Sequence, residues 1–151
     1  WEGWHENGQK KYANQFVNGV MNGPSISWHS NGKTRNEGVY TNGLLNGKWV
    51  QYHESGRIME SGAFVDGNKE GKWVFYDIYG KKYREQGFKA NRNEGKFVSY
   101  FQNGKVSEKG AYLNGARHGK WVVYDSDGKK LKEMVFENGS LMSEKDYTAK
   151  P

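Results

Sequence analysis

A spacing of 24 residues runs through the whole chain and constrains its fold more than any other feature. Six glycines recur at this spacing without insertion or deletion: Gly8, Gly32, Gly56, Gly80, Gly104 and Gly128. A second set follows at the same spacing: Gly23, Gly47, Gly71, Gly95 and Gly119. Self-similarity at a fixed period of about 20–50 residues is typical of repeat arrays. The 151 residues therefore read as about six copies of one small unit rather than as one compact domain.

Aromatic residues repeat in the same register and form three rows. The tyrosine row consists of Trp4, Trp28, Tyr52, Tyr76, Tyr100 and Tyr124. The phenylalanine row consists of Phe16, Tyr40, Phe64, Phe88, Tyr112 and Phe136. The tryptophan row consists of Trp49, Trp73, Phe97 and Trp121, with Ser25 as an exception. Only 34% of the chain is hydrophobic but 15% is aromatic, so we expect these rings to supply most of the buried surface.

Each unit has the pattern of one β-hairpin. A β-prone segment such as Trp49–Tyr52 is followed by a polar tripeptide ending in glycine, and a second extended run ends at Phe64. Asn-Gly and Asp-Gly pairs, such as Asp66-Gly67, favour the positive φ of tight hairpin turns. Six hairpins give about 12 strands and a sheet roughly 58 Å long. The predicted fold is all-β: an elongated, twisted, single-layer antiparallel sheet of about six 24-residue β-hairpin repeats.

The repeats predict one domain. The array spans residues 1–143, and residues 144–151 are expected to form a C-terminal tail because Ser143 and Lys145 replace the glycine and tryptophan of the last copy. Trp1 stands in the tryptophan row without the Gly-Lys that precedes it elsewhere, so we expect the natural protein to extend upstream. An export or lipoprotein signal would lie in that missing part. No stretch is apolar enough to cross a membrane, and we expect a soluble chain of unknown compartment.

The repeat resembles a known family. The residues that carry the resemblance are Gly47-Lys48-Trp49-x-x-Tyr52-x-x-x-Gly56-Arg57, followed by Gly62-x-Phe64-x-Asp66-Gly67, and their equivalents from Gly71 and from Gly119. This pattern is similar to the bacterial variant of the MORN repeat, found in proteins labelled YwqK-family antitoxins. The resemblance covers Trp1 to about Gly139. It implies a sheet of hairpins, a binding or scaffold role, and no intrinsic catalysis.

No motif in the chain indicates catalysis, a cofactor or a metal site. Three of the four histidines, His5, His29 and His53, share one position in successive copies, but neighbours in such a row lie about 9.6 Å apart, too far to share one zinc ion. We expect them to be solvated at the turns. Glu37, Glu85 and Glu133 also recur at one position, and we expect them to form a solvated row. The chain contains no cysteine, which excludes thiolate ligands and nucleophiles.

Basic and aromatic rows are the candidate binding features. The formal net charge is +6, and 16 of the 23 Lys and Arg residues fall into two registers, after the first glycine and beside the second. Such rows either bind an anionic partner or keep the strands soluble. The rings likewise either stack on a ligand or form the core. The candidate binding residues are Trp28, Trp49, Tyr52, Trp73, Tyr76, Tyr100, Trp121, Tyr124, Arg57, Lys81, Lys105 and Lys129.

Three functions remain open from the sequence. The first is a non-catalytic scaffold or binding module that contacts another macromolecule through a long sheet face. The second, from the family label, is an antitoxin or immunity protein that binds a toxin. The third is a cell-surface carbohydrate-binding array, because such arrays are also rich in Trp, Tyr and Gly. The expected partner is another protein; anionic lipid or polysaccharide is the alternative, and nucleic acid is not expected.

Overall fold

The computed structural model describes residues 1–148 and contains one 14-stranded antiparallel sheet. Its described residues contain no helix. The strands are β1 (Glu2–Trp4), β2 (Lys10–Val17), β3 (Val20–Trp28), β4 (Thr34–Thr41), β5 (Leu44–Leu45), β6 (Gly47–Tyr52), β7 (Ile58–Val65), β8 (Asn68–Tyr76), β9 (Lys82–Lys89), β10 (Arg92–Tyr100), β11 (Val106–Leu113), β12 (Ala116–Tyr124), β13 (Lys130–Glu137) and β14 (Ser140–Asp146). This confirms the all-β repeat array predicted from the 24-residue period.

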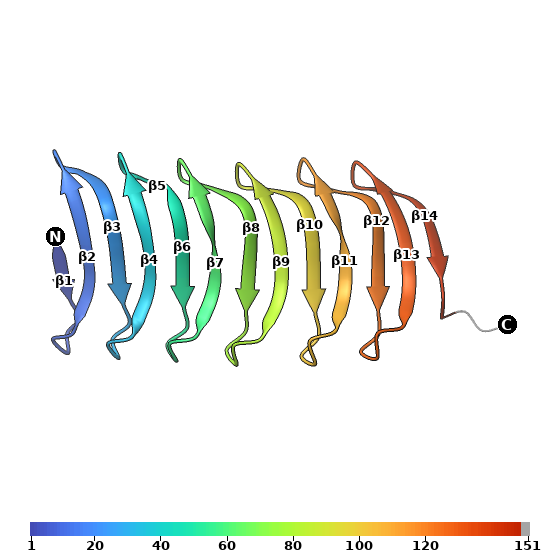
Figure 1. Ribbon diagram of the computed structural model, residues 1–151, viewed down its shortest axis with the longest axis horizontal. Helices are drawn as coiled ribbons and strands as arrows, with labels where there is room; N and C mark the ends of the chain where they lie inside the picture. The colour runs from blue at the N-terminus through green and yellow to red at the C-terminus, as the bar shows by residue number, and fades with distance from the viewer. Residues whose placement is uncertain (149–151) are drawn as a thin grey trace.

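Strands follow one another across the sheet in chain order, so every neighbour is the next hairpin arm. Only β5 leaves this path, as a two-residue strand that pairs with β4. In Figure 1 the hairpins stand side by side along the long axis, and the chain ends lie at opposite ends of the array. The strand count exceeds the predicted 12 because β5 is separated from β6 and because β14 pairs with β13 after the sixth hairpin.

Two kinds of turn occupy the two long edges. One edge carries two-residue turns such as Asn114-Gly115, whose φ angles of 50° and 86° are those of a type I′ hairpin turn. The other edge carries longer loops, such as the one from His53 to Arg57, closed by a hydrogen bond from the His53 N–H to the Arg57 carbonyl. Figure 1 shows these loops along the lower edge of the sheet.

The hairpins are joined to one another through their turns as well as through their strands. The Gly115 N–H donates to the Asn93 carbonyl at 2.9 Å, and the Gly139 N–H donates to the Arg117 carbonyl at 2.9 Å. Equivalent bonds join most earlier copies. Each unit is thus stabilised by its immediate neighbours, as expected for a quasi-one-dimensional array.

The last strand extends beyond the predicted end of the array. Glu144, Lys145 and Asp146 pair with β13, although the sequence placed them in the tail. Every residue of β14 is exposed, and among the described strands only β13 pairs with it. Residues 149–151 of the predicted tail lie outside the described part of the chain.

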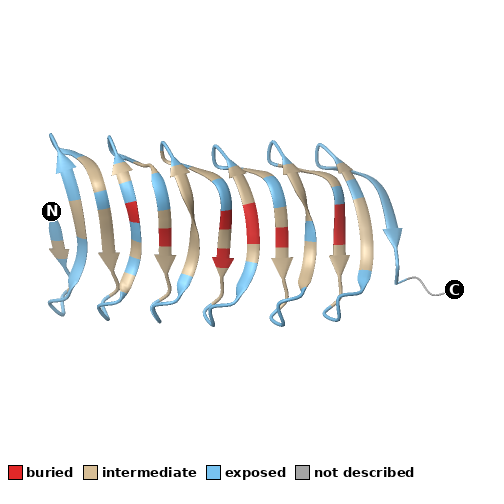
Figure 2. Ribbon diagram, viewed as in Figure 1, coloured by how far each residue is buried: buried red, intermediate tan, exposed pale blue. Residues whose placement is uncertain are grey.

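Buried residues lie near the middle of the strands, between the two rows of turns (Figure 2). They belong to both faces of the single sheet. One face, here called the tryptophan face, buries Trp73, Phe75 and Trp121; the other, called the valine face, buries Val50, Val98 and Val122.

Candidate functional site

The tryptophan face carries two runs of contacting rings, one from Trp49 to Phe88 and one from Phe97 to Phe136. Trp73 meets Phe64 with ring centroids 5.0 Å apart and Phe88 at 6.2 Å, and Trp121 meets Tyr112 at 5.1 Å. All three contacts are edge-to-face, the favourable arrangement for aromatic pairs. The tryptophan and phenylalanine rows therefore share one face and contact each other there.

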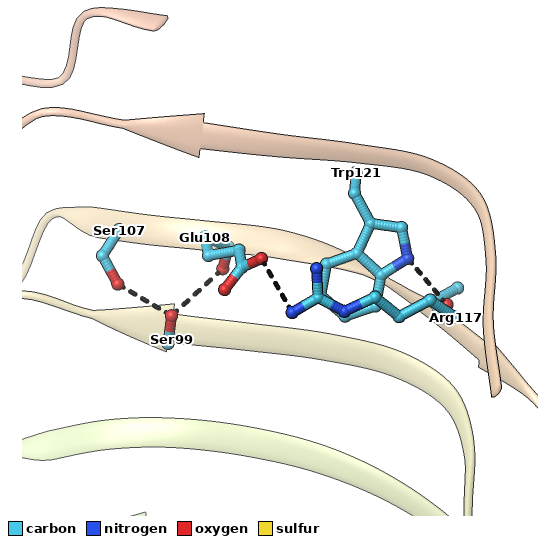
Figure 3. Close-up of polar contacts among 6 residues, drawn as sticks. Ser99, Ser107, Glu108, Arg117 and Trp121 are labelled. Atoms are coloured by element: carbon cyan, nitrogen blue, oxygen red, sulfur yellow. Dashed lines mark hydrogen bonds and ion pairs between the residues drawn. The ribbon is translucent and has the colours of Figure 1, made fainter. Parts of the chain in front are cut away.

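Trp121 is completely buried in a single-layer sheet because long side chains pack over its ring. The Arg117 guanidinium lies 4.3 Å from the ring centroid and is held by Glu108, with 3.3 Å between Arg117 Nη2 and the Glu108 carboxylate. The indole N–H donates to the Ala111 carbonyl at 3.0 Å (Figure 3). Lys69 covers Trp73 in the same way, with its Nζ 4.5 Å from the ring centroid.

Each of these indoles packs directly against the backbone of a glycine in the adjacent strand. A Cβ on Gly110 would stand 2.1 Å from Trp121 Cδ2, and one on Gly62 would stand 2.2 Å from Trp73 Cδ2. The sequence-based reasoning missed this row of glycines, which lies 11 residues before the tryptophan row. A signal was present: where Ser25 replaces tryptophan, Asn14 replaces glycine, and the two side chains are hydrogen-bonded at 2.6 Å.

The valine face carries valine, tyrosine and lysine in parallel rows. Its valines alternate along each strand with the tryptophan row, so they point to the opposite side of the sheet. The tyrosine row lies on this face, since Tyr52 lines a hollow with Val50 and Tyr124 lines another with Val122. Lysine recurs here beside the second glycines: Lys48, Lys72, Lys96 and Lys120.

The glutamate row also lies on the valine face, and the prediction that it is solvated is wrong for Glu85. The Glu85 side chain is only 8% exposed and pairs with Lys72 at 3.3 Å and with Lys82 at 2.5 Å. The hydrogen bond from Lys82, and then the Lys72 ammonium, hold the pKa of Glu85 below its ordinary value against the opposing effect of burial.

Glu133 repeats the same arrangement two repeats, or 48 residues, later. Its carboxylate lies 3.2 Å from the Lys120 ammonium and 2.6 Å from that of Lys130. The hydrogen bond from Lys130 is the main cause that lowers the pKa of Glu133 to about 2. Each of these glutamates therefore forms ion pairs with two lysines.

The candidate basic residues lie in the loop edge rather than on the valine face. Arg57, Lys81, Lys105 and Lys129 are exposed, and each follows a loop glycine. Lys81 Nζ donates to the Gln102 carbonyl at 2.8 Å and Lys105 Nζ donates to the Asp127 carbonyl at 3.1 Å, each in the next loop along the edge. These side chains join successive loops.

The histidines take part in the same loop-to-loop contacts instead of standing free in solvent. The Nε2 atoms of His5, His29 and His53 lie 2.8, 3.0 and 3.1 Å from the carbonyls of Trp28, Tyr52 and Tyr76, respectively. Within residues 1–148, no three side chains of the metal-binding types gather at one point.

The candidate aromatic residues divide between the two faces. Trp73 and Trp121 have no exposed surface, so they have a packing role and present nothing to a partner. Trp28, Trp49, Tyr52, Tyr76, Tyr100 and Tyr124 are half-buried. Of the predicted binding residues, the tyrosines are therefore the ones that the structure brings together on an accessible face.

Tyr52 provides a spectroscopic test of this arrangement. Its hydroxyl donates to the Glu37 carboxylate, which, together with burial, raises the pKa of Tyr52 to about 12. The bond stabilises the fold fully below pH 10, the ordinary tyrosine pKa, and this contribution is lost as the pH rises through about 12. Ultraviolet titration should show a late tyrosine component that Tyr52→Phe removes. Glu37→Gln should move that component to lower pH, and an unchanged curve in both variants would contradict the contact.

Comparison with known proteins supports the repeat assignment in two adjacent copies. No curated protein matches the chain, and residues 1–148 include no helix with the length and apolar character needed to span a membrane. The two matching segments coincide with the hairpins β10–β11 and β12–β13. Residues 93–114 and 117–138 each match the family described as the MORN repeat variant.

Proposed function

We propose that this chain is a non-catalytic binding module that uses its valine face to hold another protein. MORN repeats generally mediate binding and scaffolding, which agrees with the open repeat array of this chain. The observation that carries the proposal is a difference in exposure between the faces. On the tryptophan face, Arg117 and Lys69 cover the buried indoles. The valine face instead presents half-exposed tyrosines beside exposed lysines.

Hollows on the valine face support it as the contact surface. One of them, about 570 Å³, lies over β3, β4, β6 and the start of β7 and is lined mainly by apolar side chains, including Ile26, Val39, Val50 and Ile58. Lys48 and Glu37 lie at its polar margin. An apolar hollow with a few polar groups is the usual form of a recognition site.

The other two functions are weighed against the same geometry. A toxin would be one such protein partner, and an antitoxin role predicts that the chain copurifies with the product of a neighbouring gene. A bacterial origin of the chain belongs to that same proposal. A carbohydrate array would need exposed rings to stack on sugars, and burial of Trp73 and Trp121 argues against it.

Site-specific photocrosslinking tests the proposed face. A photoreactive residue placed at Lys48, on the valine face, should give discrete adducts in extracts of the native organism. The same residue at Lys105, in the loop edge, is the matched control and should give few. The proposal fails if neither site, or only Lys105, forms adducts that compete with unlabelled protein.

A further inference from the structure

One position of the valine face differs in charge from its equivalents in neighbouring copies. The row that carries Glu37, Glu85 and Glu133 has Lys109 in the copy between the last two. Strand pairing is equivalent at all three later positions: Val74 lies opposite Glu85, Val98 opposite Lys109, and Val122 opposite Glu133. Lys109 therefore occupies the place at which the adjacent copies have a carboxylate.

This exchange leaves positive charges together. Lys96 is the equivalent of Lys72 and Lys120, each of which pairs with a glutamate in this row. Beside Lys96 stands Lys109 instead, and among the described residues neither ammonium has an ion-pair partner. Lys109 only approaches the Tyr124 ring, at 5.7 Å from the centroid. Like charges in adjacent places are unfavourable unless an anion joins them.

A hollow of about 450 Å³ lies at this position, over β10 to β13. Its walls carry four ammonium groups, two of which form ion pairs with Glu133, and its apolar part comes from neighbouring strands. The lining residues are Lys96, Phe97, Lys109, Ala111, Val122 and Tyr124, with Gly110, Lys120 and Lys130. The hollow combines uncompensated charge with apolar and aromatic surface.

We propose that this hollow binds an acidic segment of a partner protein, with a Glu or Asp carboxylate held between Lys96 and Lys109. The carboxylate takes the place that Glu85 and Glu133 occupy in the adjacent copies. This inference rests on the proposed binding function and assigns the partner's chemistry at one part of the valine face. A charge-assisted contact of this kind is the strong class of hydrogen bond.

The distribution of charge favours a protein segment over a membrane or a nucleic acid. A membrane or a long polyanion would lie along the whole face, where Glu37, Glu85 and Glu133 interrupt the lysine row. In the described part of the chain, Lys48 also lacks an ion pair, but it lines a different hollow. Lys96 and Lys109 line this one together, beside Val122 and Tyr124, which are available to apolar groups. A single acidic side chain flanked by apolar ones matches this pattern.

Lys109→Glu is the decisive variant because it installs the residue found in the adjacent copies. The expected product is an additional ion pair with Lys96, so the fold is retained or stabilised. Binding of a fluorescein-labelled decapeptide of alternating Glu and Leu should weaken at least about tenfold, as expected for loss of one charge-assisted contact. Fluorescence anisotropy at physiological salt measures the affinity.

Lys105→Glu is the matched control, since it makes the same charge change four residues away in the loop edge. It should alter the peptide affinity by less than about twofold. Equal weakening by both variants would overturn the proposal, because it would mean non-specific attraction. Binding to phosphatidylserine vesicles without binding to the peptide would also overturn it, in favour of a membrane.

Failure of the acidic-segment proposal can be distinguished from failure of the proposed binding function of the valine face. Crosslinked adducts at Lys48 together with no peptide binding at the Lys109 hollow would overturn only the acidic-segment proposal. Loss of both would overturn the valine face as a binding surface. Peptide binding that Lys109→Glu abolishes and Lys105→Glu spares supports both.

Discussion

Replacing Trp121 with alanine is expected to lower the free energy of unfolding by about 3–5 kcal/mol, the range for large aromatic residues removed from a packed core. Trp121 has no exposed surface. Its ring meets Phe97, Tyr112 and Phe136 with centroids 5.3, 5.1 and 6.4 Å away. In a single-layer sheet no second layer can move in to fill the space, so the cavity would remain or admit water.

The loss extends beyond the ring itself. Arg117 would no longer have an aromatic surface beneath its guanidinium, and the Ala111 carbonyl would lose the indole N–H that it accepts. Trp121→Phe keeps most of the apolar surface but not this hydrogen bond, and should cost about 1–2 kcal/mol. The two variants thus separate packing from hydrogen bonding.

Urea unfolding followed by far-ultraviolet circular dichroism measures both changes. Trp4→Ala is the matched control: Trp4 is 57% exposed in the terminal strand β1, and its removal should change stability by less than about 1 kcal/mol. Because each hairpin contacts only its neighbours, the Trp121→Ala transition should broaden as the C-terminal hairpins unfold first. A midpoint like that of the unmodified chain would contradict the packing of these buried rings.

The period alone predicted the hairpins and the aromatic rows, but it could not say which rows share a face. A fixed spacing of 24 residues places Trp73 and Phe88 in separate rows, and only the observed register puts both rings on the tryptophan face. Positive φ at the junction glycine Gly71 (73°) interrupts the regular alternation of the strand. The tyrosine row lies on the opposite face because it follows the tryptophan row by three residues, an odd spacing along an alternating strand.

Charge rows were harder to interpret from the sequence than apolar rows. Lysines after the loop glycine, such as Lys81 and Lys105, donate hydrogen bonds to backbone carbonyls of the next loop. Whether they can do so depends on the distance between neighbouring loops, which the residue type alone does not give. Glu85 is covered by two ion-paired lysines, Lys72 from the adjacent strand β8 and Lys82 from its own strand β9. The recurrence of a charged residue every 24 residues shows that its position has a role in the repeat. Only the pairing register of the strands shows which side chains contact one another there.

Replacing a glycine beneath a buried indole is expected to give the second large loss of stability. Gly110→Ala should cost about 3 kcal/mol, the upper part of the range for overpacking a tight site. Its new Cβ would stand 2.1 Å from Trp121 Cδ2 and 2.3 Å from Cε2, both atoms of a rigid ring that is enclosed on all sides. The φ of Gly110 is not positive, so the cost comes from the clash alone and not from backbone strain.

A double-mutant cycle isolates that clash. With Trp121→Ala already present, Gly110→Ala should have little further effect, because the atoms it would strike are gone; the coupling energy should reach about 1–3 kcal/mol. The chain itself contains the precedent, since Asn14 stands opposite Ser25 where the indole is absent. Additive effects in urea unfolding would mean that the glycine row serves the backbone rather than the ring. Strong coupling would establish glycine and tryptophan, 11 residues apart, as the pair that lets a one-layer sheet have a core.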